Sequence, residues 1–558
     1  MLRRPPWPLV AVWLCTLAVF LPALAGEYAD DDLDLLETSP TFAGIEHLFD
    51  AVRAPFWGYE LGYWRPLTSA LLCVGHEVGG GHPVAIHAAV LLVHLGAATL
   101  AFGIARRLGV GPAASAAAAA LFALHPCQVE SVAWVAAAGD PLAGAATLLS
   151  VWAWLGWRAR STGLPWLAWL AFALALASKE SGLMALGWIA AAEVVQRGEP
   201  GRRGVFPAWG GLLVVVGLWF WLRVLVFGDL GAGFDRGRLD LDDAGLRGVL
   251  LRAWLAGGFL AVPTGWLGFT PYRVVPADPE GLRRALVPFA LIAALWGATT
   301  FAAVRARRRV AVLGALGFGV AITPAVLLPA NLGPWPLVDR YVYTALFGVA
   351  LLLAGSGLCP PAFGAVLALA AGTYSATLVP QWRSHDTVVD RALRDVPEHP
   401  EAHYLAANRE RARMQSLPAT LKYEAERRER ARAAFDAYQR VQELLEQPLY
   451  AGAHLRAVLG VHAAVGAADV ALAGGLRPPG VVLAEVEALA RAHPSSASVQ
   501  VMLGVALHAT GDFTAAEQAW RRALELDPGS EPARANLVRL YRSLGREEDA
   551  QALEGAPR

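Results

Sequence analysis

The sequence predicts an all-α protein in which a polytopic helical membrane domain precedes a C-terminal helical repeat region. The chain is 56% hydrophobic and 17% charged, with a mean hydropathy of +0.42, whereas soluble domains usually carry about 25% charged residues. Apolar segments of the length that crosses a bilayer as a helix recur along the first two thirds. From residue 397 onward the chain becomes rich in Arg, Glu and Ala with helical periodicity.

Bulk composition excludes some classes of partner and site. The 47 basic and 47 acidic residues give a net charge of zero, so we expect no nucleic-acid partner. The four cysteines lie in or beside apolar segments and form no CxxC pair. We therefore expect neither a structural zinc site nor a disulfide framework.

The predicted membrane domain, residues 1–380, contains about eleven apolar segments. They are residues 7–25, 83–105, 112–126, 140–157, 164–178, 181–196, 206–227, 285–304, 310–329, 341–356 and 360–379. The first segment, with Arg3 and Arg4 before it and ALA at 23–25, also fits a signal peptide. Its length favours a retained span, and either interpretation places residue 27 onward outside.

Lysine and arginine clusters orient the segments. Clusters such as RARRR at 305–309 follow alternate segments, and such clusters mark cytoplasmic loops. The loops at 26–82 and 228–284 then lie outside the cytoplasm. An odd number of spans places the C-terminal region there too.

A linker at 381–400 leads into a predicted repeat domain at 401–556. Its clearest unit, residues 497–528, has small and large residues at the spacing of a tetratricopeptide repeat (TPR). They are Leu503-Gly504, Leu507, Gly511, Ala516, Trp520, Ala523 and Pro528. A second copy begins near 531, and earlier copies are degenerate. Stacked repeats form concave surfaces that bind peptides or proteins, so we expect this region to bind an acceptor polypeptide.

Ionisable residues gather at the predicted outer ends of the segments. Each has a simpler interpretation, such as a solvated flank or an arginine that snorkels to the headgroups. Together, however, carboxylates and cations from separate segments on one face are typical of a functional site. These residues are Asp30, Asp31, Asp32, Arg65, His125, Glu130, Asp140, Lys179, Glu180, Asp339 and Arg340.

Their chemistry suits sugar transfer from a lipid phosphate. A carboxylate beside an acceptor hydroxyl can act as a general base. Arginine and lysine at the bilayer edge can hold a phosphate. The apolar bundle would hold the lipid, and the outer face would admit the acceptor. The glycine-rich stretch at 75–82 lacks the lysine and strand context of a nucleotide-binding P-loop.

Several pieces of the chain resemble one family. They are YADDDLDLL, YWRPLTSALL, HPVAIHAAVLLVHLGAATLAFGIARRLG, ALFALHPCQVESVAWVAAAGDPLAG, LALASKESGL and LVDRYVYTALFGVALLLA. In this order they resemble bacterial relatives of the transmembrane and TPR O-mannosyltransferases, within the GT-C class of polytopic glycosyltransferases. The resemblance covers about 27–196 and 331–356, and it is loose across 197–330.

The resemblance implies an inverting transfer from a polyprenyl-phosphate-linked sugar. The family's acidic pair maps to Asp30 and Asp31, with Asp32 leaving the register ambiguous by one. Its LHPxQxESVAW piece maps to Leu124–Trp134 and places Glu130 near the site. Asp339 replaces the family's Glu before Arg340. Residues Ala136-Ala137-Ala138-Gly139 replace a polar, SGR-like stretch, which puts phosphate binding in question.

We therefore expect Asp30 or Asp31 to be the catalytic base. We expect Arg65, Lys179 and Arg340 to bind the lipid phosphate. We expect Glu130, Asp140 and His125 to orient the acceptor and the donor. We expect no required cofactor or metal, although carboxylates this dense could bind a divalent ion.

The expected location is a bacterial inner membrane, with the site and the TPR region on the periplasmic side. The acceptor is expected to be Ser or Thr of a protein, with a glycan or glycolipid as the alternative. A non-catalytic TPR scaffold and a lipid-sugar transporter are the competing classes. The outward charges disfavour the scaffold, because an anchor needs none of them, and acids on one face only disfavour the transporter.

Overall fold

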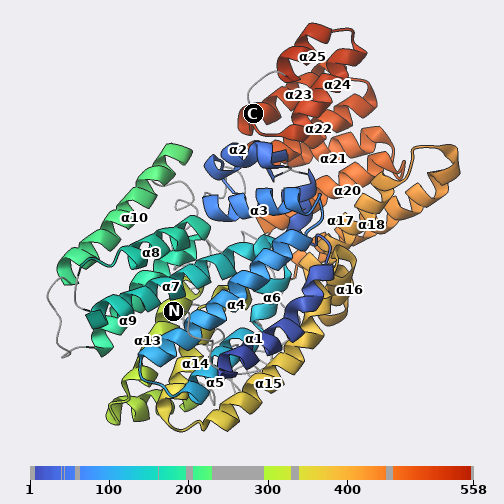
Figure 1. Cartoon of the computed structure of the whole chain (residues 1–558). Helices are drawn as coiled ribbons and strands as arrows, with labels where there is room; N and C mark the ends of the chain where they lie inside the picture. The colour runs from blue at the N-terminus through green and yellow to red at the C-terminus, as the bar shows by residue number, and fades with distance from the viewer. Residues whose placement is uncertain are drawn as a thin grey trace. The chain divides into compact units, whose positions relative to one another are not determined.

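The computed structural model is helical throughout the part of the chain that it describes and contains no strand there (Figure 1). The described residues are 7–38, 40–42, 44–56, 63–160, 163–196, 205–228, 294–327, 339–447 and 456–554. The predicted outer loop at 228–284 lies outside them except for its first residue, as does the start of the predicted segment 285–304. The chain divides into two compact units, residues 1–391 and 392–558.

Unit 1 is the predicted membrane domain, a bundle of apolar helices. They are α1 (Trp7–Phe20), α4 (Val84–Arg107), α5 (Pro112–Leu124), α7 (Gly139–Arg160), α8 (Trp166–Ser178), α9 (Met184–Val195), α10 (Val205–Phe227), α13 (Arg309–Leu327), α14 (Ala345–Ser356) and α15 (Pro361–Leu378). Among the described residues, five helical stretches are long and apolar enough to cross a membrane. They are Trp7–Ala25, Val84–Arg107, Val135–Arg160, Val205–Phe227 and Pro361–Trp382. The predicted segments 112–126, 164–178, 310–329 and 341–356 contain shorter apolar helices, so the total of about eleven spans stays a prediction.

Glycines allow two of these helices to meet backbone to backbone. A Cβ atom on Gly314 of α13 would lie 2.4 Å from the Leu352 backbone nitrogen of α14. One on Gly348 of α14 would lie 2.6 Å from the Phe318 nitrogen of α13. Small residues at helix interfaces are how membrane helices gain close packing without a hydrophobic driving force.

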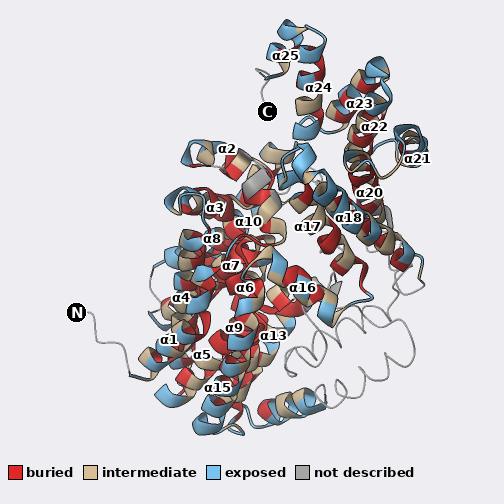
Figure 2. Cartoon of the chain, turned by 90° about the vertical axis from the view of Figure 1, so that its right-hand side faces the viewer, coloured by how far each residue is buried: buried red, intermediate tan, exposed pale blue. Residues whose placement is uncertain are grey.

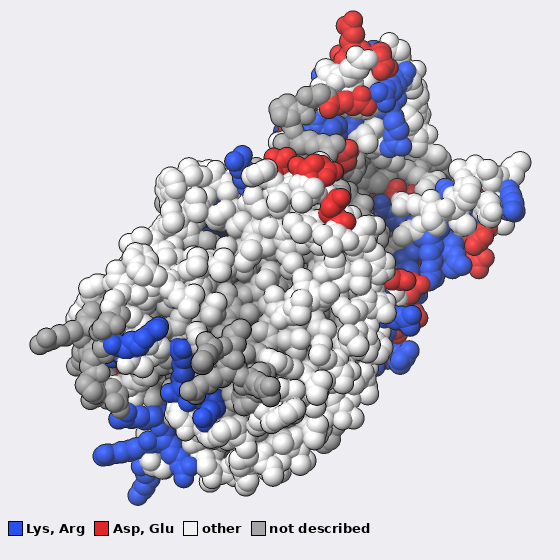
Figure 3. Space-filling view, in the orientation of Figure 1, with Lys and Arg blue, Asp and Glu red and all other residues white. Residues whose placement is uncertain are grey.

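The two ends of the bundle differ in charge. Helix α7 begins with Asp140 in its first turn and ends with Arg158 and Arg160. A helix of this length rises about 33 Å, so these residues lie at opposite ends of it. Helix α4 likewise ends in Arg106 and Arg107. In Figure 3, Lys and Arg gather at the lower left of unit 1, where α4 and α7 finish in Figure 1.

Short helices lie in the connections at the other end. They are α2 (Leu48–Arg53), α3 (Pro66–Val78), α6 (Gln128–Ala133), η6 (Glu180–Leu183) and η10 (Asp339–Val342). The first apolar helix, α1, packs against α4, α5 and α15. Residues 385–395, inside the predicted linker, form α16 (His385–Asp395), and the division between the units falls within this helix.

Unit 2 consists of consecutive helices, most of which pack against the next. They are α17 (Pro400–Ser416), α18 (Glu424–Leu445), α20 (Val461–Ala473), α21 (Pro479–Ala492), α22 (Ala497–Thr510), α23 (Phe513–Leu526), α24 (Glu531–Ser543) and α25 (Glu547–Glu554). Helix α20 is mostly buried because α18 and α22 both pack on it, whereas α21 buries only Val482 and Val486, one turn apart (Figure 2).

The predicted repeat 497–528 forms the pair α22 and α23. Ser496 and Asp512 cap the two helices through hydrogen bonds from the Val499 and Ala515 nitrogens. Gly511, with φ of 89°, ends α22 in the left-handed conformation that favours glycine. Trp520 is buried and donates from Nε1 to the Val501 carbonyl, at 3.0 Å.

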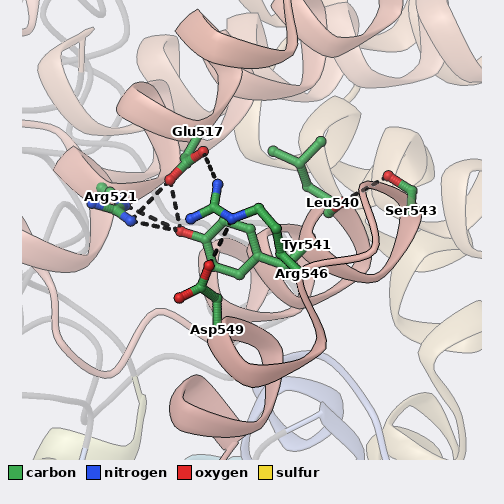
Figure 4. Close-up of polar contacts among 7 residues, drawn as sticks. All are labelled: Glu517, Arg521, Leu540, Tyr541, Ser543, Arg546 and Asp549. Atoms are coloured by element: carbon green, nitrogen blue, oxygen red, sulfur yellow. Dashed lines mark hydrogen bonds and ion pairs between the residues drawn. The ribbon is translucent and has the colours of Figure 1, made fainter.

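A polar network joins α23 to α24 and α25 (Figure 4). Glu517 accepts hydrogen bonds from the Tyr541 hydroxyl at 2.9 Å and from Arg546 at 2.8 Å. Arg521 also donates to the Tyr541 oxygen, and Arg546 donates to Asp549 at 2.6 Å. Because Glu517 binds both Tyr541 of α24 and Arg546, the residue before α25, this network helps to fix how these helices stack on the repeat.

The close approach of α22 and α23 predicts the effect of one substitution. A Cβ atom on Gly504 would lie 2.4 Å from Trp520 Nε1. Gly504→Ala should lower the free energy of unfolding by about 1–3 kcal/mol through overpacking, which outweighs the gain in helix propensity. Thermal unfolding of the full-length protein, followed by Trp fluorescence, measures this. Gly480→Ala is the matched control because open space surrounds that position. Equal melting temperatures for both variants would contradict this packing.

Candidate functional site

The acidic loop after α1 is anchored by the third of its aspartates. Asp32 is 1% exposed, and its carboxylate accepts hydrogen bonds from the Ala29 nitrogen at 3.0 Å and the Ala136 nitrogen at 2.6 Å. Burial raises the pKa of Asp32 well above its usual range, although the backbone N–H groups favour its charged form. Asp32 therefore ties the loop to the segment between α6 and α7.

The other two aspartates are more accessible. Asp30 and Asp31 are half-buried. Asp30 has a φ of 55°, a left-handed conformation that aspartate tolerates better than most residues. Its backbone nitrogen donates to Nδ1 of His385 at 3.2 Å. The structure thus gives Asp32 a distinct, anchoring position and leaves Asp30 and Asp31 as the predicted reactive pair.

Beside this loop lie three cation–carboxylate pairs, of which the Lys179–Asp140 pair is buried and the other two are partly buried. Lys179 Nζ contacts both oxygens of Asp140, at 2.6 and 2.7 Å. Arg65 donates to Glu180 Oε2 at 2.9 Å and 3.0 Å. Arg340 pairs with Glu130. These pairs bring together Arg65, Glu130, Asp140, Lys179 and Arg340, five of the residues that the sequence predicts for the site.

Local backbone geometry positions these side chains. Lys179 is the extended residue at which α8 ends, with φ of −162° and ψ of 151°. Asp140 faces it from the first turn of α7. The end of α8 is bound to α3, because the Thr68 hydroxyl donates to the Ser178 carbonyl at 2.7 Å. Arg65 immediately precedes α3 and so reaches the same place.

Aromatic rings lie against the cations. Tyr341 lies between two of them, with its ring centre 5.4 Å from Lys179 Nζ and 5.1 Å from the Arg340 guanidinium. Arg340 also lies 5.0 Å from the ring centre of Trp134. Trp134 donates from Nε1 to the Ala29 carbonyl at 3.1 Å. The ion pairs and the acidic loop are therefore joined through one tryptophan.

Burial shapes the electrostatics of the cluster. It lowers the pKa of Lys179 to about 8, against the attraction of Asp140. It raises the pKa of Glu130, against the attraction of Arg340. Among the described residues, Glu130 Oε2 and Glu180 Oε1 have no hydrogen-bond partner. The cluster therefore holds carboxylate oxygens that can still accept a hydrogen bond.

This arrangement has a consequence for anion binding. Each of the three cations predicted to bind phosphate already has a carboxylate partner. A phosphate that enters must share these cations or displace a carboxylate. Glu130 pairs directly with Arg340, and its role in orienting acceptor or donor stays a prediction.

His125 has a different environment. It lies in the turn before α6, where its Nδ1 accepts a hydrogen bond from the Cys127 nitrogen at 3.2 Å. The role of His125 in orienting the acceptor and the donor stays a prediction. The described residues contain no group of three or more His, Cys, Asp or Glu placed to hold a metal ion.

Two structural features were missed in the sequence analysis. The anchoring role of Asp32 depends on the backbone of residue 136, which no spacing reveals. Arg223, 5% exposed within the apolar helix α10, was overlooked as part of segment 206–227. Its signal was available, since a charge within an apolar segment is itself a candidate functional residue.

Comparison with known proteins supports part of this interpretation. A family model described as "Tetratricopeptide repeat" matches residues 507–553, which confirms the predicted TPR region. The chain is 30% identical over 166 residues to human "Protein O-mannosyl-transferase TMTC4", covering 26% of this chain and 22% of the relative. It is 30% identical over 178 residues to Drosophila melanogaster "Protein O-mannosyl-transferase Tmtc1", covering 30% and 20%.

A third relative extends the similarity. "Protein O-mannosyl-transferase Tmtc2" of Drosophila melanogaster is 30% identical over 193 residues, covering 33% of this chain and 20% of the relative. The chain thus spans only about a fifth of the length of these curated relatives. No solved structure matches the chain. The similarity supports the predicted resemblance in its coarse form, a relative of protein O-mannosyltransferases with a TPR region.

Substitution of Asp32 should cost more stability than substitution of an exposed aspartate. Asp32→Asn replaces one of two acceptor oxygens with an amide group that cannot accept from a backbone N–H. We expect the free energy of unfolding to fall by about 1–3 kcal/mol, the cost of an unsatisfied buried group. Asp50→Asn, at an exposed aspartate of α2, should change it by less than about 0.5 kcal/mol. Thermal unfolding of both variants in detergent measures the difference, and similar losses in both would contradict the anchoring role.

Proposed function

We propose that this chain is a GT-C type glycosyltransferase that transfers a sugar from a polyprenyl-phosphate donor to a hydroxyl of a protein. The observation that carries the proposal is that three cation–carboxylate pairs meet at one end of an apolar bundle, beside an anchored acidic loop. The similarity to proteins named protein O-mannosyl-transferases supports the reaction class.

The proposed chemistry uses the loop and the cluster in different roles. Asp30 or Asp31 accepts the proton of the acceptor hydroxyl, whose oxygen attacks the anomeric carbon of the donor sugar. The bond between that carbon and the phosphate oxygen breaks, and its electron pair leaves with the polyprenyl phosphate. Attack opposite the leaving group inverts the anomeric configuration. Arg65, Lys179 and Arg340 stabilise the negative charge on the leaving phosphate.

The proposed orientation of the protein in the membrane follows from the charge distribution of the bundle. The arginines at the ends of α4 and α7 would face the cytoplasm, as positive residues beside membrane spans usually do. The ion-pair cluster would then face the periplasm of a bacterial inner membrane. The TPR region is proposed to bind the acceptor polypeptide, as stacked repeats do.

A transfer assay tests the proposal. The purified full-length protein in detergent is given a panel of radiolabelled polyprenyl-phosphate sugars and envelope proteins as acceptors. Label on protein is the expected result. Label on glycan or glycolipid alone would overturn the protein acceptor, and no transfer from any donor by folded protein would overturn the enzyme. A parallel reaction with EDTA tests the expectation that no divalent metal is required.

Substitution of the proposed bases makes the assay specific. Asp30→Asn or Asp31→Asn should reduce transfer at least about a hundredfold in one of the two variants, because a general base contributes about a hundredfold to ten-thousandfold. Asp50→Asn is the matched control, since Asp50 is an exposed aspartate of α2 in the same outer loop. Full activity in both Asp30→Asn and Asp31→Asn would show that neither is the base.

A further inference from the structure

The acidic loop is also held by a segment from the other end of unit 1, residues 382–385, which lies between α15 and α16. The Glu27 nitrogen donates to the Arg383 carbonyl at 2.7 Å. The Asp30 nitrogen donates to Nδ1 of His385 at 3.2 Å, although 355 positions separate the two residues in the chain. The 382–385 segment therefore contacts the loop beside one of the two proposed bases.

A tryptophan of the same segment packs against the ion-pair cluster. The ring of Trp382 stacks on that of Trp134, with the ring centres 5.2 Å apart and the planes at 21°. Trp134 in turn donates to the Ala29 carbonyl and lies against Arg340. Both tryptophans are buried. The 382–385 segment is thus packed into the site from which the proposed chemistry proceeds.

Asp30 has a backbone conformation that needs support. Its φ of 55° lies in the left-handed region, which costs energy for every residue except glycine. Such conformations persist where the surrounding contacts hold them, and they cluster at functional sites. The hydrogen bond to His385 fixes the direction of the Asp30 N–H. Because the peptide unit is planar, this bond also fixes the plane on one side of that φ rotation.

Helix α16 does not need the His385 ring in order to begin. Ser384 Oγ accepts a hydrogen bond from the Thr387 nitrogen at 3.3 Å, and Thr387 Oγ1 accepts one from the Ser384 nitrogen at 3.0 Å. Val388 and Val389 are fully buried and fix the first turns by packing. These contacts hold the helix, and the His385 ring reaches the acidic loop from a rigid element.

The other anchors of the loop act on either side of Asp30. Glu27 is held through the Arg383 carbonyl, and Asp32 is held through the backbone N–H of residue 136. These contacts place the loop as a whole, whereas His385 acts on the Asp30 backbone directly. Loss of the His385 acceptor should therefore leave the loop in place and disturb Asp30.

We propose that His385 is a positioning residue that holds Asp30, and with it the proposed reactive pair, in the geometry that transfer requires. The inference rests on the proposed function, because it concerns a carboxylate of that reaction. His385 acts through the backbone of Asp30, as an acceptor at a ring nitrogen that carries no proton. A reacting group that is misplaced by about 1 Å can lose about a hundredfold in rate.

Steady-state transfer by the purified full-length protein tests this, with the radiolabelled polyprenyl-phosphate sugar of the panel that labels protein. His385→Ala should lower kcat about tenfold to a hundredfold. The KM for the donor should change less than about twofold, because the phosphate-binding cations are untouched. His385→Asn should keep most of the wild-type kcat, since asparagine carries its amide oxygen on Cγ, as histidine carries Nδ1. Similar losses in both variants, or a change in KM alone, would overturn the acceptor role.

His82→Ala is the matched control. His82 is an exposed histidine of the predicted outer loop 26–82, and its Nδ1 also accepts a backbone N–H, that of Val84 at 3.3 Å. This variant should keep the wild-type kcat, and a fall equal to that of His385→Ala would overturn the specific role of His385. If His385→Ala does not fold, His385→Gln takes its place, because glutamine carries its oxygen one carbon farther out than Nδ1.

The outcomes also distinguish this inference from the function on which it rests. Wild-type protein that transfers no sugar from any donor would overturn the proposed function, and the inference with it. Wild-type transfer that His385→Ala leaves unchanged would overturn the inference alone. A lower kcat that only follows a smaller folded fraction, measured by thermal unfolding of the same sample, would overturn the inference as well.

Discussion

Unit 1 is organised by three cation–carboxylate pairs at one end of an apolar bundle. A charge removed from water is tolerated only with a partner of opposite sign and good geometry. The Lys179–Asp140 pair satisfies this by joining the end of α8 to the start of α7. The Arg65 and Arg340 pairs add the residues before α3 and in η10 to the same place. The helices can therefore meet here in few arrangements, and the site is built from those pairs.

The acidic loop shows how a dense cluster of like residues divides its tasks. Three consecutive aspartates cannot all face one substrate, and their mutual repulsion must be relieved. Hydrogen bonds from the backbone N–H groups of Ala29 and Ala136 favour the charged form of Asp32 against this repulsion and fix the loop. Asp30 and Asp31 are half-buried in the loop that Asp32 anchors, and a fixed position is what a reactive carboxylate requires.

Features that depend on residues close together in the sequence could be predicted, whereas contacts between residues far apart in the sequence could not. Helical periodicity and segment length are local, so the all-α architecture and the TPR pair around Gly504 and Trp520 were predictable. Charge asymmetry predicted that Arg65, Lys179 and Arg340 share one end of the bundle. Which carboxylate each one meets was not predictable, because Arg65 and Glu180 are separated by long apolar helices. Arg223 was overlooked because its segment was judged by its average hydropathy.

The replacement of a polar stretch by Ala136–Gly139 can now be weighed in physical terms. Residue 136 contributes its backbone N–H to Asp32, and every residue except proline offers that group. The loop is therefore anchored whichever side chain stands there. An arginine absent from this stretch removes a cation that a lipid phosphate could use. The cluster offers compensation, because two of its three carboxylates, Glu130 and Glu180, have an oxygen that can still accept a hydrogen bond. Redistribution among existing pairs can supply positive charge to a phosphate without any new cation.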